Sequence, residues 1–267
     1  MTRRIFNSDK KLLGFSDPQP VEVVNQTSLV PILLTCEHAG RITPKTLKKL
    51  GLENDAFDKH IAYDIGAEGL ATKLAYGLRA TLILQRYSRL VIDCNRPYDA
   101  TDCITPVSDG TVIPGNQGLN RTARAQRYTE IHEPYHRTIS GLLDARQNRP
   151  IMLISIHSFT PRMKNVERPW HAGLLFNHDD RVAKRLMKLL TQHNLNIAYN
   201  QPYSVDPFTD YTIPVHGEGR NIPHVLIEVR NDEIKCETGQ KRWARYIGNA
   251  LKTIVWGPDP IFDSQVR

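Results

Sequence analysis

Short apolar runs alternate along the chain with longer stretches in which apolar residues recur at helical spacing. The runs have the length of buried strands, and they cover residues 29–35, 80–84, 90–92, 151–156, 172–176 and 225–229. The periodic stretches predict helices over 61–78, 122–148, 180–193 and 241–254. Strands that alternate with amphipathic helices predict an α/β fold, here a three-layer α/β/α sandwich around a mixed, mostly parallel central sheet.

Proline, glycine and polar residues mark the ends of these elements and the loops between them. A helix is predicted to begin at Thr43 and Pro44, since proline is favoured in a first helical turn. Pro134 predicts a kink, or two shorter helices, within 122–148. Residues 1–28 are polar and predict an irregular leader before one α/β domain over 29–267. Long loops are predicted over 99–118, 161–169 and 199–219, and loops of such length are often functional.

Composition narrows the class of protein and of partner. The chain has 267 residues, of which 40% are hydrophobic, enough for a substantial core, and a net charge of +7. The basic residues are spread at helical spacing and the aromatic content is only 7%, so we predict no nucleic-acid partner. Such a charge could instead steer a small anionic substrate into a cleft.

The cysteines and the hydropathy indicate the compartment. Four cysteines without a CxxC pair argue against a disulfide framework and against a thiolate zinc site. The first residues lack the apolar stretch of a secretion signal, and no apolar run approaches the roughly 20 residues that span a bilayer. We therefore predict a cytoplasmic protein that does not associate with membranes.

Several predicted strands end in side chains that buried strands rarely contain. One run leads to His157 and another to Glu228, while two earlier runs lead into segments that hold His38 and Arg96. In open α/β sheets the carboxyl ends of the strands line the ligand crevice. Two histidines and a carboxylate with an open position form a hydrolytic zinc site, and a further carboxylate can serve as general base.

Six segments in a fixed order carry a resemblance to a known family: EHAGRITP, HIAYDIGA, SRLVIDCNRP, EPYH, SIHSFTP and PHVLIEVRND. Together they resemble the N-formylglutamate amidohydrolase (N-formylglutamate deformylase) family and, more distantly, the zinc carboxypeptidases, over roughly residues 30–250. The resemblance implies a zinc-carboxypeptidase-like (phosphorylase/hydrolase-like) fold. It also implies a small anionic N-acyl amino acid, such as N-formylglutamate, as substrate.

The resemblance assigns roles residue by residue. His38 and His157 resemble metal ligands, and Glu228 resembles the general base. Asn95 and Arg96 resemble the pair that binds a substrate carboxylate. The implied cofactor is one zinc ion per chain, with another divalent ion as the alternative.

One position departs from the carboxypeptidase pattern. That pattern has a glutamate three residues after the first histidine, where this chain has Arg41. The carboxylate ligand must come from elsewhere, and we predict Asp64, placed on the predicted helix 61–78, with Glu37 as the alternative. Glu37 ranks second because neighbouring side chains on an extended segment point in opposite directions.

Further residues are predicted around this centre. Arg89 is expected to help stabilise the oxyanion. Tyr211, Arg220 and Arg230 are predicted to contact the substrate. His132 and His136, four residues apart, partly match a helical metal-binding pair, but Pro134 lies between them and we favour a structural role under the site.

These residues predict a metal-dependent hydrolase that cleaves the amide bond of an N-formyl or N-acyl amino acid. Two alternatives stay open at this point. One is a carboxypeptidase-like peptidase, and the other is a non-catalytic nucleic-acid-binding or scaffold protein on the same fold.

Overall fold

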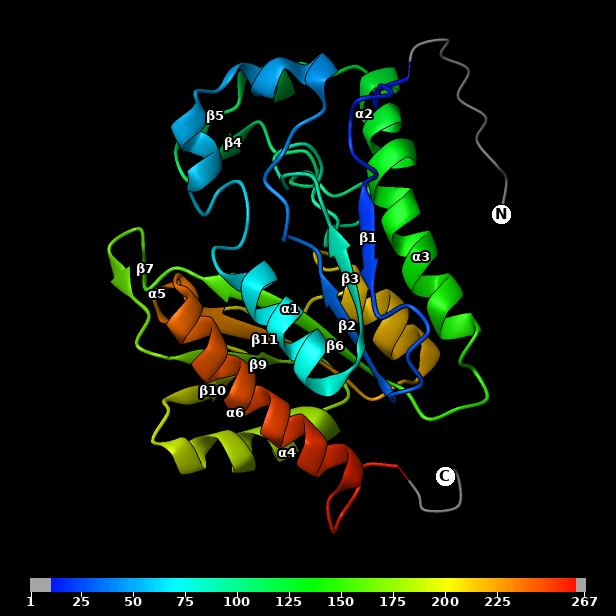
Figure 1. The fold of residues 1–267 in the computed structure, drawn as a ribbon. Coiled ribbons are helices and arrows are strands. Elements are labelled where there is room, and N and C mark those ends of the chain that lie inside the picture. The colour runs from blue at the N-terminus through cyan, green and yellow to red at the C-terminus, as the bar shows by residue number, and fades with distance from the viewer. Residues whose placement is uncertain (1–10, 263–267) are drawn as a thin grey trace.

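The computed structural model describes residues 11–262, and its centre is a seven-stranded mixed sheet in the order β1-β3-β2-β6-β11-β9-β10 (Figure 1). The strands are β1 (Val21–Val24), β2 (Ile32–Cys36), β3 (Thr81–Gln85), β6 (Met152–Phe159), β9 (Ala172–Leu175), β10 (Ile197–Tyr199) and β11 (His224–Arg230). β3, β2, β6 and β11 are parallel, β1 and β9 are antiparallel to their central neighbours, and β10 is parallel to β9. The predicted mixed, mostly parallel sheet is confirmed.

Helices cover both faces of this sheet. The helices are α1 (Ala67–Leu78), α2 (Arg121–Arg127), α3 (Glu133–Asp144), α4 (Arg181–Leu190), α5 (Asn231–Ile234) and α6 (Glu237–Trp256). Figure 1 shows α1, α4 and α6 together on one side and α3 on the other. The three layers of the predicted sandwich are therefore present.

Shorter elements connect these layers. They are the 3₁₀ turns η1 (Lys45–Gly51), η2 (Asn54–Asp58), η3 (Pro114–Asn116), η5 (Thr191–His193) and η7 (Glu218–Arg220), the π-helical turns η4 (Tyr128–His132) and η6 (Ile213–Gly217), and the hairpins β4–β5 (Val107–Ser108, Thr111–Val112) and β7–β8 (Arg162–Met163, Val166–Glu167). The predicted loops 99–118, 161–169 and 199–219 thus contain short regular elements. The helix predicted at Thr43 and Pro44 is η1, which begins directly after Pro44.

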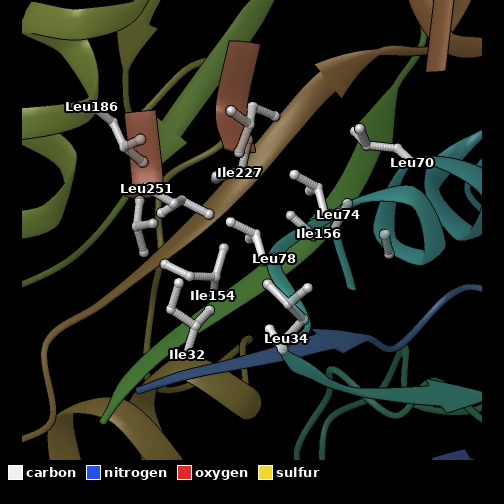
Figure 2. Close-up of a cluster of buried hydrophobic side chains, with 14 of the residues drawn as sticks. Ile32, Leu34, Leu70, Leu74, Leu78, Ile154, Ile156, Leu186, Ile227 and Leu251 are labelled. Carbon is white, nitrogen blue, oxygen red and sulfur yellow. The ribbon is translucent and has the colours of Figure 1, made fainter. Parts of the chain in front are cut away.

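Strand alternation divides the core into two. Ile154 and Ile156 of β6 point to the side of α1, α4 and α6, where they pack with Leu74 of α1 and Leu251 of α6 (Figure 2). Leu153 points to the opposite side, toward α3. Because side chains alternate along a strand, the next residues on that second face are Ser155 and His157. The pattern that builds the core therefore also places the polar residues on the α3 side.

Three predicted elements are wrong in part. Residues 90–92 are buried but lie in turns rather than in a strand. Residues 21–24 of the predicted irregular leader form β1, a short segment with three valines that pairs with β3. The prediction for residues 1–10 lies outside the described residues.

The third difference is the start of the helix predicted over 61–78. α1 begins at Ala67, and residues 61–66 form turns. Gly66 has a φ of 84°, which a continuing helix does not allow, and a Cβ there would come within 2.2 Å of the Ile234 carbonyl oxygen. Asp64 therefore lies in a turn before the helix and not on the helix as predicted.

The long helix predicted over 122–148 is two helices. α2 and α3 are joined by the π-helical turn η4, and α3 begins one residue before Pro134. The backbone stays helical through η4, and a π-helical turn lacks the i→i−4 bond that Pro134 could not donate. The two shorter helices predicted from Pro134 are confirmed.

Candidate active site

Neighbouring strands bring His157 and Glu228 together. The two residues are direct partners in the parallel register of β6 and β11, so their side chains leave the same face of the sheet. Both lie inside their strands rather than at the tips, since β6 continues to Phe159 and β11 to Arg230. The convergence expected from the sequence is therefore a consequence of strand pairing.

His38 and Asp64 reach this place from two turns. His38 follows β2 by two residues, and the Asp64 backbone N–H donates to the His38 carbonyl oxygen at 3.0 Å. One ligand atom each from His38, Asp64 and His157 lies within 4.8 Å of the others, and all three residues are buried. This group of three is the one that the sequence predicted as the metal site.

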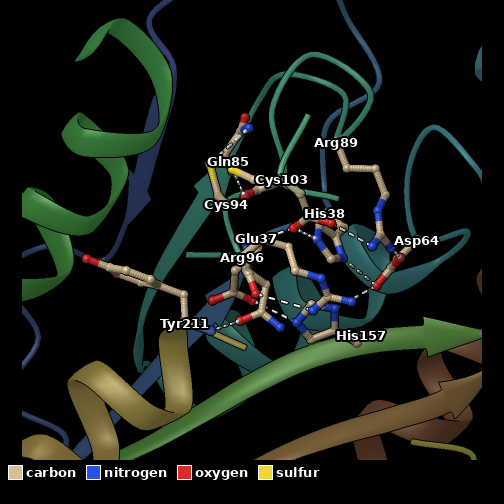
Figure 3. A network of polar contacts seen from close by, with 12 residues as sticks. Glu37, His38, Asp64, Gln85, Arg89, Cys94, Arg96, Cys103, His157 and Tyr211 are labelled. Atoms are coloured by element: carbon tan, nitrogen blue, oxygen red, sulfur yellow. Dashed lines mark hydrogen bonds and ion pairs between the residues drawn. The ribbon is translucent and has the colours of Figure 1, made fainter. Parts of the chain in front are cut away.

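The histidine rings are oriented as in a metal centre (Figure 3). Nδ1 of His157 lies 2.8 Å from Asp64 Oδ2, and Nδ1 of His38 lies 3.4 Å from the same oxygen. Within residues 11–262, Nδ1 of His38 has no hydrogen-bond partner although it is buried. A buried nitrogen without a partner is costly, and a cation between these three atoms would satisfy it.

Each of the two histidines has a second carboxylate at its other ring nitrogen. Nε2 of His38 bonds to Asp93 Oδ1 at 2.7 Å, and Nε2 of His157 lies 2.9 Å from Glu37 Oε2. A carboxylate on the outer nitrogen is typical of metal-bound histidine, because it fixes the ring and raises its basicity. The donor set, two imidazoles and one carboxylate, thus fits a divalent ion such as Zn²⁺.

This geometry favours Asp64 over Glu37 as the carboxylate ligand. Glu37 lies at the other nitrogen of His157, fully buried, where it accepts hydrogen bonds from Ser155 Oγ at 2.7 Å and Tyr135 Oη at 3.3 Å. Asp93 was not predicted to belong to the site. Its position at the end of an apolar run, two residues before Asn95, was the signal that could have revealed it.

The charges of the site are mutually stabilised. Burial alone would raise the pKa of Asp64, but His38 and His157 outweigh burial and hold that pKa below its ordinary range. In the same way Arg89 and His38 hold the pKa of Asp93 well below its usual value. Both carboxylates are therefore ionised at neutral pH, as metal binding requires.

Glu228 has the opposite electrostatic environment. Burial and the neighbouring Asp64 carboxylate raise the pKa of Glu228 to about 7, although His157 acts in the opposite direction. Its Oε2 is buried without a hydrogen-bond partner among the described residues. A carboxylate with a pKa near neutrality and a free oxygen has the properties of a general base.

These side chains open into a cavity of about 640 Å³. Its walls include His38, Asp64, His157 and Glu228, together with residues of the loop after β10 such as Tyr203. A cavity of this volume accommodates a small molecule. Tyr203 lies in the predicted loop 199–219, but it was not predicted to belong to the site.

Three further predicted residues line the same cavity. Arg89 donates to Asp93 Oδ2 at 2.6 Å and lies 3.5 Å from Asp64 Oδ1. Arg96 also lines the cavity, and Asn95 is held there through its side-chain oxygen, which accepts from the Thr212 backbone N–H at 3.1 Å. The structure therefore brings these three predicted residues to the cavity.

The remaining three predicted residues do not line it. The Tyr211 ring packs 4.3 Å from the ring of His136. Arg220 forms an ion pair with Asp144 at 2.5 Å. Arg230 ends β11 at the start of α5 and forms an ion pair with Asp232 at 2.8 Å.

His132 and His136 lie below the site as buried residues. His132 Nε2 donates to the Arg96 carbonyl oxygen at 2.9 Å, and His136 Nε2 donates to the Cys94 carbonyl oxygen at 2.6 Å. His136 Nδ1 lies 3.0 Å from His216 Nε2. The histidines thus hold the backbone around Asn95, consistent with the structural role favoured from the sequence.

The fold and the buried His–Asp–His group together define an α/β protein with a mixed central sheet and a candidate metal centre on one of its faces. A family model described as N-formylglutamate amidohydrolase matches residues 30–235. The chain belongs to the N-formylglutamate amidohydrolase family, and the resemblance found in the sequence is confirmed.

Two solved structures are similar to the chain. A gene product of Agrobacterium tumefaciens is 32% identical, with a TM-score of 0.88 over 91% of this chain and 99% of that one. N-formylglutamate amidohydrolase from Ralstonia eutropha is 16% identical, with a TM-score of 0.55 over 89% of this chain and 97% of that one, and this likeness shows the fold. No curated protein matches the chain. Within residues 11–262, no helix combines the length and apolar character that a membrane crossing needs.

Proposed function

We propose that the protein is a metal-dependent amidohydrolase that cleaves an N-formyl or N-acyl amino acid into a carboxylate and a free amino acid. The observation that carries this proposal is the convergence of His38, Asp64 and His157 beside Glu228 in one cavity. Membership of the N-formylglutamate amidohydrolase family supports the reaction type and makes N-formylglutamate the first substrate to test.

The residues divide the chemistry between them. A divalent ion held by His38, Asp64 and His157 would supply Lewis acidity and a water molecule of lowered pKa. Glu228, with its unbonded Oε2, takes a proton from the attacking water and returns it to the leaving nitrogen. Arg89, at the cavity wall beside Asp64, donates toward the negative charge that develops on the acyl oxygen.

Arg96 is the proposed anchor of the substrate α-carboxylate. It lines the cavity, and its guanidinium is held by Asp102 at 2.9 Å and by the Thr209 carbonyl oxygen at 2.7 Å. These contacts hold the Arg96 guanidinium in one orientation. A carboxylate can therefore bind to its remaining N–H donors with little further loss of side-chain entropy. Asn95 then acts by holding the neighbouring loop in place.

The metal content of the purified protein, together with hydrolysis of N-formylglutamate, tests this proposal. We expect about one zinc ion per chain and release of free glutamate. His157→Ala should lose both, whereas His178→Ala, an exposed histidine outside the cavity, should lose neither. A wild-type protein that binds no metal even after zinc is added would refute the proposal and favour the non-catalytic alternative.

The peptidase alternative is tested in the same assay. A carboxypeptidase-like enzyme would release C-terminal residues from blocked dipeptides faster than it cleaves N-formylglutamate. We expect the reverse order, since the family model is that of an amidohydrolase of N-formylglutamate.

The location and partners are proposed on the same basis. Among residues 11–262 the four cysteines are unpaired and three of them are buried, which is typical of proteins kept in reducing compartments. We therefore propose a cytoplasmic enzyme whose partner is a small anionic substrate rather than nucleic acid or membrane. Fractionation of the cells that make it, with detection by antibody, checks the location.

A further inference from the structure

A second cavity lies toward the opposite end of β11 from Glu228. It measures about 470 Å³ and shares no lining residue with the cavity of the candidate active site. His224, which lines it, begins β11 four residues before Glu228, so the two residues are about 13 Å apart along the strand. The remaining walls come mainly from the loop after β9 and from η7. The second cavity is therefore separate from the proposed chemistry.

His224 is buried in this cavity with one ring nitrogen left over. The residue is 1% exposed, and its Nδ1 donates to the Ile222 carbonyl oxygen at 2.7 Å. In the neutral ring Nε2 then carries the lone pair. This Nε2 is buried and has no hydrogen-bond partner among residues 11–262. A buried acceptor without a partner is costly, so a group that the chain does not supply is expected at this nitrogen.

Glu218 presents a carboxylate to the same nitrogen. Its Oε1 lies 4.0 Å from His224 Nε2, which is too far for a hydrogen bond. Two neutral donors hold this carboxylate: the His178 backbone N–H lies 2.9 Å from Oε1, and Asn177 Nδ2 lies 3.3 Å from Oε2. No lysine or arginine in the described part of the chain forms an ion pair with Glu218. Its charge is thus held in place without a fixed cationic partner.

The other two carboxylates of the cavity already have cationic partners. Asp179 pairs with Arg181 at 2.7 Å, and Asp180 pairs with Lys184 at 2.7 Å. Glu218 and the imidazole lone pair are therefore left facing each other. Two electron-pair donors at this distance repel unless a positive charge lies between them.

The local fold builds this arrangement at Gly217. A Cβ on Gly217 would come within 2.7 Å of His224 Cγ, so a larger residue would push the imidazole away. Glu218 is the next residue and begins η7, which brings its carboxylate beside the ring. A histidine that binds a metal commonly donates its other ring nitrogen to a backbone carbonyl, because this bond fixes the tautomer and the direction of the lone pair. The bond from His224 to Ile222 has this form.

We propose that His224 Nε2 and Glu218 Oε1 form a second site for a divalent transition-metal ion, separate from the candidate active site. Metal–nitrogen and metal–oxygen distances of about 2.1 Å let one ion span the 4.0 Å between the two atoms. Imidazole and carboxylate are suitable ligands for Zn²⁺, and water in the cavity completes the coordination. With two protein ligands instead of three, this site binds more weakly than the first and fills when free zinc is raised.

Calorimetric titration of the zinc-loaded protein with further zinc tests this proposal. The wild type should bind a second equivalent beyond the one that it retains on purification. His224→Gln and Glu218→Gln should each lose the second equivalent and keep the first, which also shows that the variants are folded. Asp180→Asn is the matched control, since Asp180 lines the same cavity but pairs with Lys184, and it should keep both equivalents.

Three results of the titration would overturn the proposal. One is a wild type that binds no second equivalent at any zinc concentration at which it stays soluble. Another is a second equivalent that both variants retain, which would assign it to other surface groups. The third is loss of the second equivalent in Asp180→Asn, which would place the ion at other ligands.

The test does not depend on the proposed function. His157→Ala removes a ligand of the candidate active site, so it should lose the retained zinc and still bind one equivalent of added zinc. A wild type that retains no zinc but binds one added equivalent through His224 and Glu218 would contradict the proposed function and support this site. A single equivalent that His157→Ala abolishes would do the reverse.

Nitrogen NMR of the His224 ring distinguishes a metal ion from simpler occupants. The Nε2 resonance should shift when the second equivalent of zinc is added, and it should not shift in Glu218→Gln. An Nε2 that keeps a proton in the presence of zinc would indicate an ion pair with Glu218. An Nε2 that zinc leaves unchanged in the wild type would indicate a bridging water, and either result would overturn the proposal.

Discussion

At the scale of single residues, the site depends on pairs of groups rather than on isolated ligands. His38 lies between Asp64 and Asp93, and His157 lies between Asp64 and Glu37. The outer carboxylates orient the rings, so they should affect metal binding without touching the metal.

Asp93→Asn should weaken zinc binding by about 10- to 100-fold, because the amide cannot fix and polarise the His38 ring as the carboxylate does. Competition with a chromogenic chelator measures the affinity. Asp102→Asn is the control, since Asp102 contacts Arg96 and none of the ligands. Equal affinities in wild type and Asp93→Asn would show that the outer carboxylate is not needed.

Glu228→Gln should reduce kcat by roughly 10²- to 10⁴-fold and leave the zinc content unchanged, because the side chain keeps its size but cannot accept a proton. Steady-state kinetics with metal analysis of the same preparation check both parts. Retained activity would mean that another group is the base, and lost zinc would mean that Glu228 belongs to the ligand set.

At the scale of elements, the segment α2–η4–α3 supports the site from below. Its buried His132 and His136 hold the carbonyl groups of Arg96 and Cys94, and His216 of η6 bonds to His136. Burial lowers the pKa of His136 well below its ordinary value, so its ring is neutral. Because Nε2 of His136 donates to a carbonyl oxygen, its Nδ1 accepts from Nε2 of His216. Neutral buried histidines make stability depend on pH.

Burial lowers the pKa of both His132 and His216 to about 4, from an ordinary value of 6.5. Between these values the unfolded chain binds protons that the folded protein does not, so stability is complete above pH 6.5 and decreases as the pH falls toward 4. The loss is on the order of 3 kcal/mol per histidine. Urea unfolding across this pH range measures it.

His216→Asn should reduce this pH dependence, because one of the two titrating histidines is removed and His132 remains. His193→Ala, an exposed histidine in η5, should leave the slope unchanged. A slope that His216→Asn does not alter would assign the acid sensitivity to other groups.

At the scale of the whole molecule, stability comes from the packing of helices against the sheet. Leu74 of α1 is 1% exposed and packs in the core between α1 and the central strands (Figure 2). Leu74→Ala should cost about 2–5 kcal/mol of unfolding free energy, since it leaves a cavity in a close-packed layer.

The matched control is Tyr76→Ala on the same helix. Tyr76 is 65% exposed, so its replacement should change stability by no more than about 0.5 kcal/mol. Guanidinium unfolding of both variants at one zinc concentration tests the difference. Similar costs for the two would contradict the assignment of the core to this layer.

Elements with strong periodicity were predictable. The apolar runs that became β2, β3, β6, β9 and β11 were found, because buried strands must be apolar on both faces. Residues 90–92 satisfied the same pattern but are buried in turns. β1 was missed, because an edge strand depends on its partner β3 more than on its own composition.

The sequence by itself determined the fold class, the family and the residue types of the site. These follow from local patterns: apolar periodicity sets strands and helices, and six ordered segments identify the family. His38, His157 and Glu228 could be singled out because polar residues that end apolar runs need a reason to be buried.

Only the tertiary structure decided which groups meet. It favoured Asp64 over Glu37, added Asp93 behind His38, and left Arg220 and Arg230 outside the cavity. The physical reason is that these contacts join residues far apart in the chain, and their distances depend on strand register and turn geometry, which no local pattern encodes.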